Sequence, residues 1–557
     1  MVKACVLTIW LAAVAFPGAM GLPGGAAFGQ SVYPSIPDWE SSDPRVSTGA
    51  ALFDVDHDGW IDIVISDGND IDPGPLSVYY NNGDGTFPTK ASWKSTDYQY
   101  NGHLDVADVN GDGWLDVAVA HLGDFSTQAP VAKVYLNNEG TFSSLPDWEA
   151  GFIGQGFGCA FGDANGDGRP DLAVATGWSY GTQHEDHNLV YMNVGGTLEA
   201  SASWVSDDTY DHQGALWADA DDDGWLDLIM IASAAETRVY RNLGGVLETS
   251  ASWTTSDSYD QDGIMVAVGD VNGDGVRELF ATDNTQLGGS GRFKQYTGLA
   301  DGLFETTYSW SYYEGYGSAV ALADVNADGL LDLATGGWWE NTRLFYNTGS
   351  GLPASPSWSS TLSTVNEKIV FADVDPACGV ELLKYAHFDA TRGQKLFYLP
   401  HMQVQKLVAI YRDNVAVPPD EFTWHREHGW IALNGAPESS LDVAYTYSHS
   451  LDMVVSNWDG DEGNFLYYNQ QFDDCNDNGI PDGCDIYDGT SDDVNGNGVP
   501  DECECPPDVN VDGVVDVLDL LAVLSSWGKH AVIEDVHYDG VVDVLDLLEV
   551  LGGWGPC

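Results

Sequence analysis

A nine-residue acidic loop recurs along this chain of 557 residues, and its repetition restricts the fold more than any other feature. The loop reads DVDHDGWID from Asp54, DVNGDGWLD from Asp108 and DANGDGRPD from Asp163, and related copies begin at 219, 270 and 324. A weaker copy, DVDPACGVE, begins at Asp373. Successive copies begin 49 to 56 residues apart, so the chain contains seven similar units.

Each unit carries the signals of four short strands. A tryptophan stands upstream of the loop, an alternating stretch such as IDIVIS follows it, and an aromatic segment such as VYYNN comes later. Period-2 alternation between Gly, Asn and Asp turns is typical of strands. A four-stranded sheet repeated radially is a propeller blade, so the predicted fold class is an all-β propeller of seven repeats over residues 31–400.

The two ends of the repeat array are offset. The first unit begins with its tryptophan strand at 37–42 and the last lacks one, so the N-terminal strand is expected to complete the final blade. Residues 451–469 copy the later strands of a blade without an acidic loop before them. Residues 401–470 are therefore predicted to be a β insertion plus final blade-like strands, which form an eighth, metal-free blade or a small β-module on seven blades.

The loops have the composition of a calcium cage. Asp or Asn stands at positions 1, 3 and 5, Gly at position 6 and a carboxylate at position 9, which gathers hard oxygens around one point. An EF-hand would close with a carboxylate at position 12, between helices. Here position 12 is Ile65, Val119, Val174, Met230, Ala281 or Thr335, and strands flank the loop, so a calcium-binding β-hairpin is predicted.

These loops resemble FG-GAP (VCBS) repeats, the calcium-binding blades of integrin α-subunit propellers and of many secreted bacterial proteins. The resemblance implies a calcium site in each of six hairpins. In the seventh loop Ala377 replaces the ligand at position 5, so no ion is expected beside Asp373, Asp375 and Glu381. The implied ligands are Asp54, Asp56, Asp58, Asp62, Asp108, Asn110, Asp112, Asp116, Asp163, Asn165, Asp167, Asp171, Asp219, Asp221, Asp223, Asp227, Asp270, Asn272, Asp274, Glu278, Asp324, Asn326, Asp328 and Asp332.

Residues 471–504 form an Asp/Asn-rich segment with two further cages, DCNDNGIPD and DVNGNGVPD. They resemble thrombospondin type 3 calcium repeats, which implies a stiff calcium-bound linker. If Cys475 pairs with Cys484, Cys503 has no obvious partner. The implied ligands are Asp474, Asn476, Asn478, Asp482, Asp493, Asn495, Asn497 and Asp501.

Residues 505–557 contain two copies of a loop followed by an apolar segment of helical spacing, 27 residues apart. Position 12 is acidic here, and the segment resembles a type I dockerin of the variant that ends in Gly-Pro-Cys. The resemblance implies EF-hand-like calcium loops in a small all-α module that docks to a cohesin-like or cell-surface partner; a stability cap is the alternative. Cys505 and Cys557 bracket the module, and His537 stands at position 3 of the second loop. The implied ligands are Asp508, Asn510, Asp512, Asp516, Asp519, Asp535, Asp539, Asp543 and Asp546.

Charge and the N-terminus indicate the compartment. The chain has 86 acidic and 20 basic side chains and a net charge of −66, which excludes nucleic acid as a partner. Lys3 precedes an apolar stretch and a small-residue cleavage site, so residues 1–29 are predicted to be a signal peptide. No later apolar run is long enough for a transmembrane segment. The protein is therefore expected to be secreted or at the cell surface.

A ligand-binding face is expected opposite the calcium hairpins, where first strands begin and second strands end. Aromatic and polar residues gather there, as on surfaces that bind glycans or proteins. Adhesion or ligand binding is the leading hypothesis; a propeller polysaccharide lyase and a structural surface-layer component are the alternatives. No catalytic residues are nominated, and the balance is against an enzyme because basic residues that would steady an anionic sugar are scarce. The candidate ligand-binding residues are Tyr100, His103, Tyr210, His212, Tyr259, Trp178 and Trp338.

Overall fold

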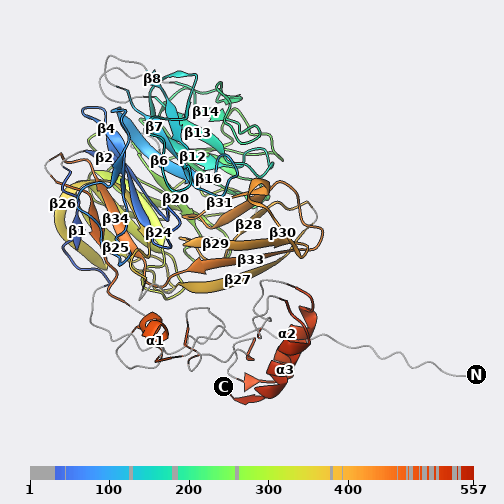
Figure 1. Ribbon diagram of the computed structural model, residues 1–557. Coiled ribbons are helices and arrows are strands. Elements are labelled where there is room, and N and C mark those ends of the chain that lie inside the picture. Colours follow the sequence, from blue (N-terminus) through green and yellow to red (C-terminus); the bar gives the residue numbers. More distant parts are fainter. Residues whose placement is uncertain are drawn as a thin grey trace, which may run out of the picture. The chain divides into compact units, whose positions relative to one another are not determined.

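The computed structural model confirms a mostly β chain of many small antiparallel sheets (Figure 1). It describes residues 32–556 except 44–45, 124–128, 178–185, 258–261, 301, 377–380, 392, 461, 472–474, 476–480, 489, 492–498, 501–502, 504–506, 510–513, 530–535 and 537–540. The predicted signal peptide, residues 1–29, lies outside the described residues.

Five successive repeats each form one four-stranded antiparallel sheet. In each sheet the acidic loop joins the first two strands. The strands are β2 (Ser47–Phe53), β3 (Asp62–Gly68), β4 (Pro73–Tyr79) and β5 (Trp93–Lys94); β6 (Asn101–Ala107), β7 (Asp116–His121), β9 (Ala132–Tyr135) and β10 (Trp148–Glu149); β12 (Gly156–Gly162), β13 (Asp171–Thr176), β14 (Leu189–Tyr191) and β15 (Trp204–Val205); β16 (Asp211–Ala218), β17 (Asp227–Ser233), β18 (Arg238–Tyr240) and β19 (Trp253–Thr254); and β20 (Val266–Gly269), β21 (Glu278–Ala281), β22 (Arg292–Tyr296) and β23 (Trp310–Tyr313). A short extra pair joins β8 (Ala129–Pro130) to β11 (Ile153–Gly154).

The last two repeats share a six-stranded sheet because two of their strands are long. β25 (Asp332–Phe345) pairs with β24 (Gly317–Ala323) through its first half and with β26 (Trp358–Ala372) through its second. The second half of β26 pairs with β34 (Asp452–Asn457), followed by β35 (Phe465–Tyr467). The N-terminal strand β1 (Trp39–Glu40) then pairs with β35, with Trp39 opposite Leu466. The expectation that the N-terminal strand completes the final repeat is confirmed.

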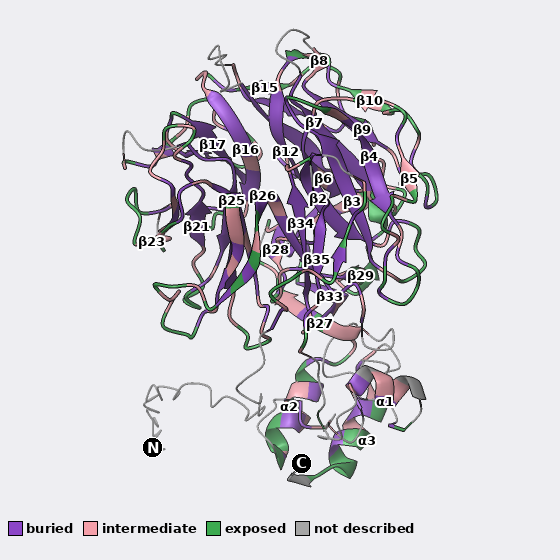
Figure 2. Cartoon of the chain, turned by 90° about the vertical axis from the view of Figure 1, so that its left-hand side faces the viewer, coloured by how far each residue is buried: buried purple, intermediate pink, exposed green. Residues whose placement is uncertain are grey.

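Neighbouring repeats pack face to face through apolar clusters, which explains why the inner strands are buried on both faces (Figure 2). The first repeat also packs against the last, since Ala50 and Ile63 share a cluster with Val370 and Val454. Hydrophobic side chains on both faces of a short strand can be buried only between two such neighbours.

A row of asparagines joins the repeats next to the hairpins. Each follows the third strand of its repeat, which in the sixth repeat is the second half of β25, and donates Nδ2 to a carbonyl at position 2 of the preceding hairpin, at 2.5 to 3.0 Å. Asn81 donates to Val374 O, so this row also joins the first repeat to the last. In the fifth repeat Gly298 takes the position, where a Cβ would lie 2.2 Å from Arg277 O. The other members are Asn137, Asn193, Asn242, Asn347 and Asn469.

A β-module interrupts the last repeat between β26 and β34, where the other repeats have their hairpin. One sheet contains β27 (Leu382–Asp389), β29 (Lys406–Arg412), β30 (Val415–Ala416) and β33 (Ser440–Tyr447). The other contains β28 (Leu396–Tyr398), β31 (Phe422–His425) and β32 (Trp430–Leu433), and the short 3-10 helix η2 (Pro419–Glu421) precedes β31. The two sheets enclose a core of their own. The expected boundary at residue 400 therefore falls inside the module, because β27 and β28 pair with β33 and β32 far along the chain.

The C-terminal part contains α1 (Asp482–Asp488), β36 (Val514–Val515), α2 (Val517–Ser525), α3 (Val544–Gly552) and β37 (Gly555–Pro556). Cys475 is bonded to Cys503, so the considered pairing of Cys475 with Cys484 is wrong. The chain folds residue 503 back to residue 475, which spacing alone did not indicate. Cys159 is free and buried, and Cys378 lies outside the described residues. None of the described helices is long and apolar enough to cross a membrane.

Candidate functional site

The six hairpin loops share one hydrogen-bonding pattern. In the first, Asp54 accepts from the N–H groups of Asp58 and Gly59, both at 3.1 Å. The position-9 carboxylate of Asp62 accepts from Val55 N at 2.9 Å and from Asn81 N at 2.8 Å. The loop therefore wraps around its own carboxylates. Gly59 has a φ of 97°, and the equivalent glycines of the other five hairpins are also left-handed, which explains glycine at position 6.

The position-9 carboxylates of these hairpins are almost completely buried beside other carboxylates. Burial, helped by neighbouring aspartates, raises the pKa of Asp62 to about 7 and that of Asp116 to about 8. Glu278 in the fifth hairpin behaves in the same way, with a pKa raised to about 7. Ionising these buried carboxyl groups therefore costs free energy. A bound cation would offset that free energy because it favours the ionised form of every carboxylate around it.

The donor set fits a hard divalent cation. Ligand atoms of Asp54, Asp56 and Asp58 lie within 4.8 Å of one another, as do those of Asp219, Asp221 and Asp227. In the third hairpin the amide oxygen of Asn165 is buried and accepts no hydrogen bond. In the fourth hairpin Arg241 already contacts Asp221. Carboxylate and amide oxygens in flexible loops are the ligands that calcium prefers.

The inserted module contacts several of the hairpins. The Tyr398 hydroxyl accepts from Asp219 N at 2.9 Å, and the Arg277 guanidinium lies 3.6 Å from the centre of the Tyr398 ring. Lys395 Nζ donates to Gly166 O at 2.5 Å. The module also borders a cleft of about 610 Å³, lined by Tyr411, Phe422 and Trp424 and by the first two hairpins. It thus covers part of the hairpin face.

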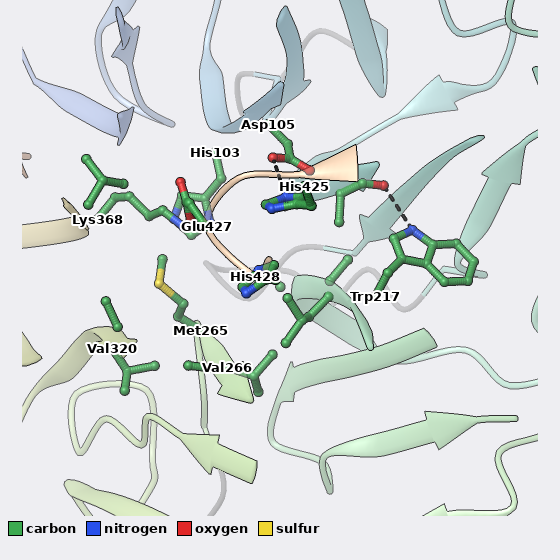
Figure 3. A pocket seen from close by; sticks show the side chains of 18 of the residues that line it. His103, Asp105, Trp217, Met265, Val266, Val320, Lys368, His425, Glu427 and His428 are labelled. Atoms are coloured by element: carbon green, nitrogen blue, oxygen red, sulfur yellow. Dashed lines mark hydrogen bonds and ion pairs between the residues drawn. The ribbon is translucent and has the colours of Figure 1, made fainter. Parts of the chain in front are cut away.

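A turn of the inserted module enters the space between the first strands of the repeats (Figure 3). Within it, His425 Nε2 lies 3.2 Å from Asp105 Oδ1, and Lys368 Nζ lies 3.4 Å from Glu427 Oε2. The remaining cavity is about 70 Å³, room for a few waters only. Figure 3 shows His428 on this turn and His103 beside it. The turn therefore fills the centre of the fold rather than leaving it open for a large ligand.

Of the predicted ligand-face residues that the structure describes, three are buried and two are half-buried. His212 is fully buried, and His103 and Trp338 are 7% and 4% exposed. Trp338 donates through its indole N–H to the buried Glu367, whose other oxygen lies 4.0 Å from His103. Burial lowers the pKa of His103 and of His212 to about 3, so both are neutral. Tyr100 and Tyr210 are half-buried, and Trp178 and Tyr259 lie outside the described residues.

Sequence reasoning did not nominate Trp339, a residue of this face with a left-handed backbone. It is 53% exposed and has a φ of 58°. The β25–β26 register shifts between Trp338 and Glu340, so Trp339 bulges out of the sheet. Its ring lies 5.9 Å from that of Tyr316, beside a cluster that includes the half-buried Tyr100 and Trp458. Tyr100, Tyr316 and Trp458 lie at strand ends opposite the hairpins, and Trp339 lies at the bulge of β25. We refer to these four residues as the aromatic patch.

The C-terminal helices have a common N-terminal arrangement. Asp516 and Asp543 cap α2 and α3, and Asp519 and Asp546 accept from the cap N–H groups at 2.7 and 2.6 Å. In the preceding segment Cys475 N donates to Asp482 at 2.9 Å, the same contact from position 2 to position 9 as in the hairpins. Asp508 is also described. The predicted ligands outside the described residues are Asp474, Asn476, Asn478, Asp493, Asn495, Asn497, Asp501, Asn510, Asp512, Asp535 and Asp539.

Comparison with known proteins supports the repeat assignment. The family model described as FG-GAP-like repeat matches residues 54–119, 124–174, 219–281 and 270–335. Together with the sheets, these matches show a protein with FG-GAP-like repeats on a propeller-like fold. No curated protein sequence matches the chain.

Two solved structures give the scale of the structural similarity. BBS1N in complex with ARL6DN has a TM-score of 0.38 and 11% identity, covering 77% of this chain and 100% of that chain. Sqt1 from Saccharomyces cerevisiae has a TM-score of 0.39 and 9% identity, covering 77% and 98%.

Proposed function

We propose that this protein is a secreted or cell-surface propeller that binds calcium in its hairpins and an extracellular glycan on the face opposite to them. The observation that carries the glycan-binding part is the aromatic patch of Tyr100, Tyr316, Trp339 and Trp458. A bulky residue at positive φ is strained, and such strain persists where surrounding structure holds it, often at binding sites. An exposed, fixed indole beside other rings suits stacking against a sugar ring.

The hairpins support the calcium part of the proposal. Three carboxylates come within 4.8 Å of one another in the first and in the fourth hairpin, and the position-9 carboxylates of all six are buried. Calcium at Asp54, Asp108, Asp163, Asp219, Asp270 and Asp324 and their loop partners would stabilise the folded state by binding it selectively. The pairing of β1 with β35 and the packing of the first repeat on the last favour seven blades in a closed ring.

The C-terminal module is proposed to anchor the propeller through calcium loops of the dockerin type. Both α2 and α3 have exposed stretches (Figure 2), and equivalent apolar side chains of the two copies are exposed. Leu521 and Leu548 are 54% and 57% exposed, and Trp527 and Trp554 are 50% and 51% exposed. Apolar side chains gathered on short helices favour a protein partner of the cohesin class.

A glycan array probed with the full chain in millimolar calcium tests the ligand part. We expect saturable binding that Trp339→Ala lowers at least tenfold. Tyr313→Ala is the matched control, because Tyr313 is 58% exposed on β23, the outermost strand of its sheet. Equal loss in both variants, or binding unchanged by Trp339→Ala, contradicts the site. New absorbance from unsaturated uronates on polyuronate spots would instead indicate a lyase, and absence of any glycan binding would favour a protein ligand.

A further inference from the structure

The interrupted last repeat brings three aspartates together from two distant segments. Asp373 and Asp375 follow β26, and Asp452 begins β34 after the inserted module. Ligand atoms of the three lie within 4.8 Å of one another. The spacing of the sequence motif had pointed to Glu381 as the carboxylate that closes this loop, so the closing residue differs from the expected one.

Asp452 occupies the structural position that Asp62 occupies in the first hairpin. Its Oδ2 accepts from Val374 N at 2.8 Å and its Oδ1 from Asn469 N at 2.7 Å. Asp62 makes the same two contacts with Val55 N and Asn81 N. The insertion therefore separates position 9 from positions 1 and 3 in the sequence but leaves them together in the fold.

A second observation points to a ligand at this place. Asp373 is 4% exposed, and its Oδ1 is buried without a hydrogen-bond partner. Its Oδ2 accepts from Ser448 Oγ at 2.5 Å. Among the described residues, no lysine or arginine forms an ion pair with Asp373, Asp375 or Asp452. A buried carboxylate oxygen with no donor, beside two more carboxylates, is costly to ionise, and a cation bound between the three carboxylates would offset that cost.

We propose that Asp373, Asp375 and Asp452 bind a seventh divalent cation of the calcium class, which joins the inserted module to the repeat that it interrupts. The inference rests on the proposed calcium function of the six continuous hairpins. The ion would lie at the base of the module, where the chain leaves and re-enters the propeller. It would therefore hold the two chain crossings together, a role that no other hairpin has.

Ion counting on the full chain tests the proposal. Calcium per chain is measured by mass spectrometry after dialysis against micromolar free calcium. We expect Asp452→Asn and Asp375→Asn each to bind about one ion fewer than the wild type. Asp389→Asn, whose side chain in the same module is 99% exposed, is expected to keep the wild-type number. Asp116→Asn, in the second hairpin, is expected to lose one.

The outcomes separate this inference from the proposed function. Loss in Asp116→Asn with wild-type counts in Asp452→Asn and Asp375→Asn overturns the seventh site alone. Wild-type counts in all three contradict calcium binding by the hairpins. Hydrogen exchange of the unmodified protein does not depend on variants folding: calcium should protect the amides of Val374 and Asn469. Equal exchange there with and without calcium, while Val109 is protected, overturns the seventh site.

Discussion

Trp339 shows how one residue can combine strain and exposure. Its φ of 58° lies in the left-handed region that bulky side chains rarely adopt, and its ring is 53% exposed. Trp338, one position earlier, is 4% exposed and hydrogen-bonded to Glu367. The buried Trp338 thus holds the bulge in place, and the exposed ring of Trp339 is free to contact a ligand.

Replacing Trp339 by glycine should separate stability from binding. Glycine adopts positive φ freely, so relief of strain offsets the lost ring contacts, and the unfolding free energy should stay within about 1 kcal/mol of the wild type. Glycan affinity should fall at least tenfold. Urea unfolding in calcium and a binding titration measure the two effects. The matched variant Trp338→Ala should instead cost roughly 3–5 kcal/mol, because it removes a buried side chain.

The sequence prediction placed Trp338 on the ligand-binding face, whereas the structure buries Trp338 and exposes Trp339. A bulge inserts one residue and reverses the facing of the side chains after it, and its position depends on the partner strand. His212 was a candidate for the same face, and the structure buries it fully. Residue type thus located the region, while the packing of distant strands decided which side chains reach its surface.

The hairpin is the element through which protons, and calcium in the proposed function, affect the stability of the fold. Burial raises the folded-state pKa of Asp62 and Asp116 to about 7 and 8, above the value of about 4 for an unfolded aspartate. Without calcium the folded protein therefore holds protons that the unfolded chain has released. This contribution to the unfolding free energy is complete below about pH 4 and is lost as the pH rises through 7 to 8.

We therefore expect the calcium-free protein to lose stability between pH 5 and pH 8, and calcium to remove most of that loss. Urea unfolding at several pH values, with a chelator or with millimolar calcium, measures the slope. Calcium binding at pH 6.5 should also release protons, which calorimetry in buffers of different ionisation enthalpy detects. A calcium-free stability that rises over this pH range would contradict the assigned burial of these carboxylates.

The asparagine row also stabilises the contacts between neighbouring repeats. Replacing one of its members should therefore lower the unfolding free energy. Asn137 donates to Val55 O at 2.9 Å and accepts from Gly140 N at 2.9 Å, both in buried surroundings. Asn137→Ala leaves these groups unpaired, so we expect a loss of roughly 1–3 kcal/mol in unfolding free energy. Asn138→Ala, at the exposed neighbouring position, should change it by less than about 0.5 kcal/mol. Equal effects would contradict a structural role for the row.

The repeats could be predicted from sequence because each hairpin and its flanking strands are local. The inserted module could be predicted only in outline. Its first strand, β27, pairs with β33 some fifty residues later, and the boundary becomes visible only once that pairing is known. For the same reason Asp452 was not assigned to the loop at Asp373, although residues 451–469 copy the strands that follow the loops of the other repeats.

At the scale of the whole molecule, net charge is the dominant property. A net charge of −66 opposes compaction, and bound cations reduce that repulsion. The position-9 carboxylates bury part of this charge between the strands of each repeat. The folded state is therefore expected to depend on cations more than a neutral protein of similar size would.

Sodium chloride should partly replace calcium in reducing the repulsion between carboxylates. In chelator, raising the salt concentration from 0.05 to 0.5 M should raise the melting temperature, because screening shortens the range of repulsion between carboxylates. In millimolar calcium the same change should have a smaller effect. Differential scanning calorimetry makes the comparison, and a salt effect that is larger in calcium than in chelator would count against bound ions as the main source of neutralisation.

Anomalous scattering from crystals of the full chain grown in calcium chloride tests the central claim most directly. Data collected at long wavelength should show a peak within coordination distance of the carboxylates in each of the six continuous hairpins, at Asp54, Asp108, Asp163, Asp219, Asp270 and Asp324. Hairpins without such peaks, in crystals that diffract well enough to place their carboxylates, would contradict the account of this protein as a calcium-bound propeller.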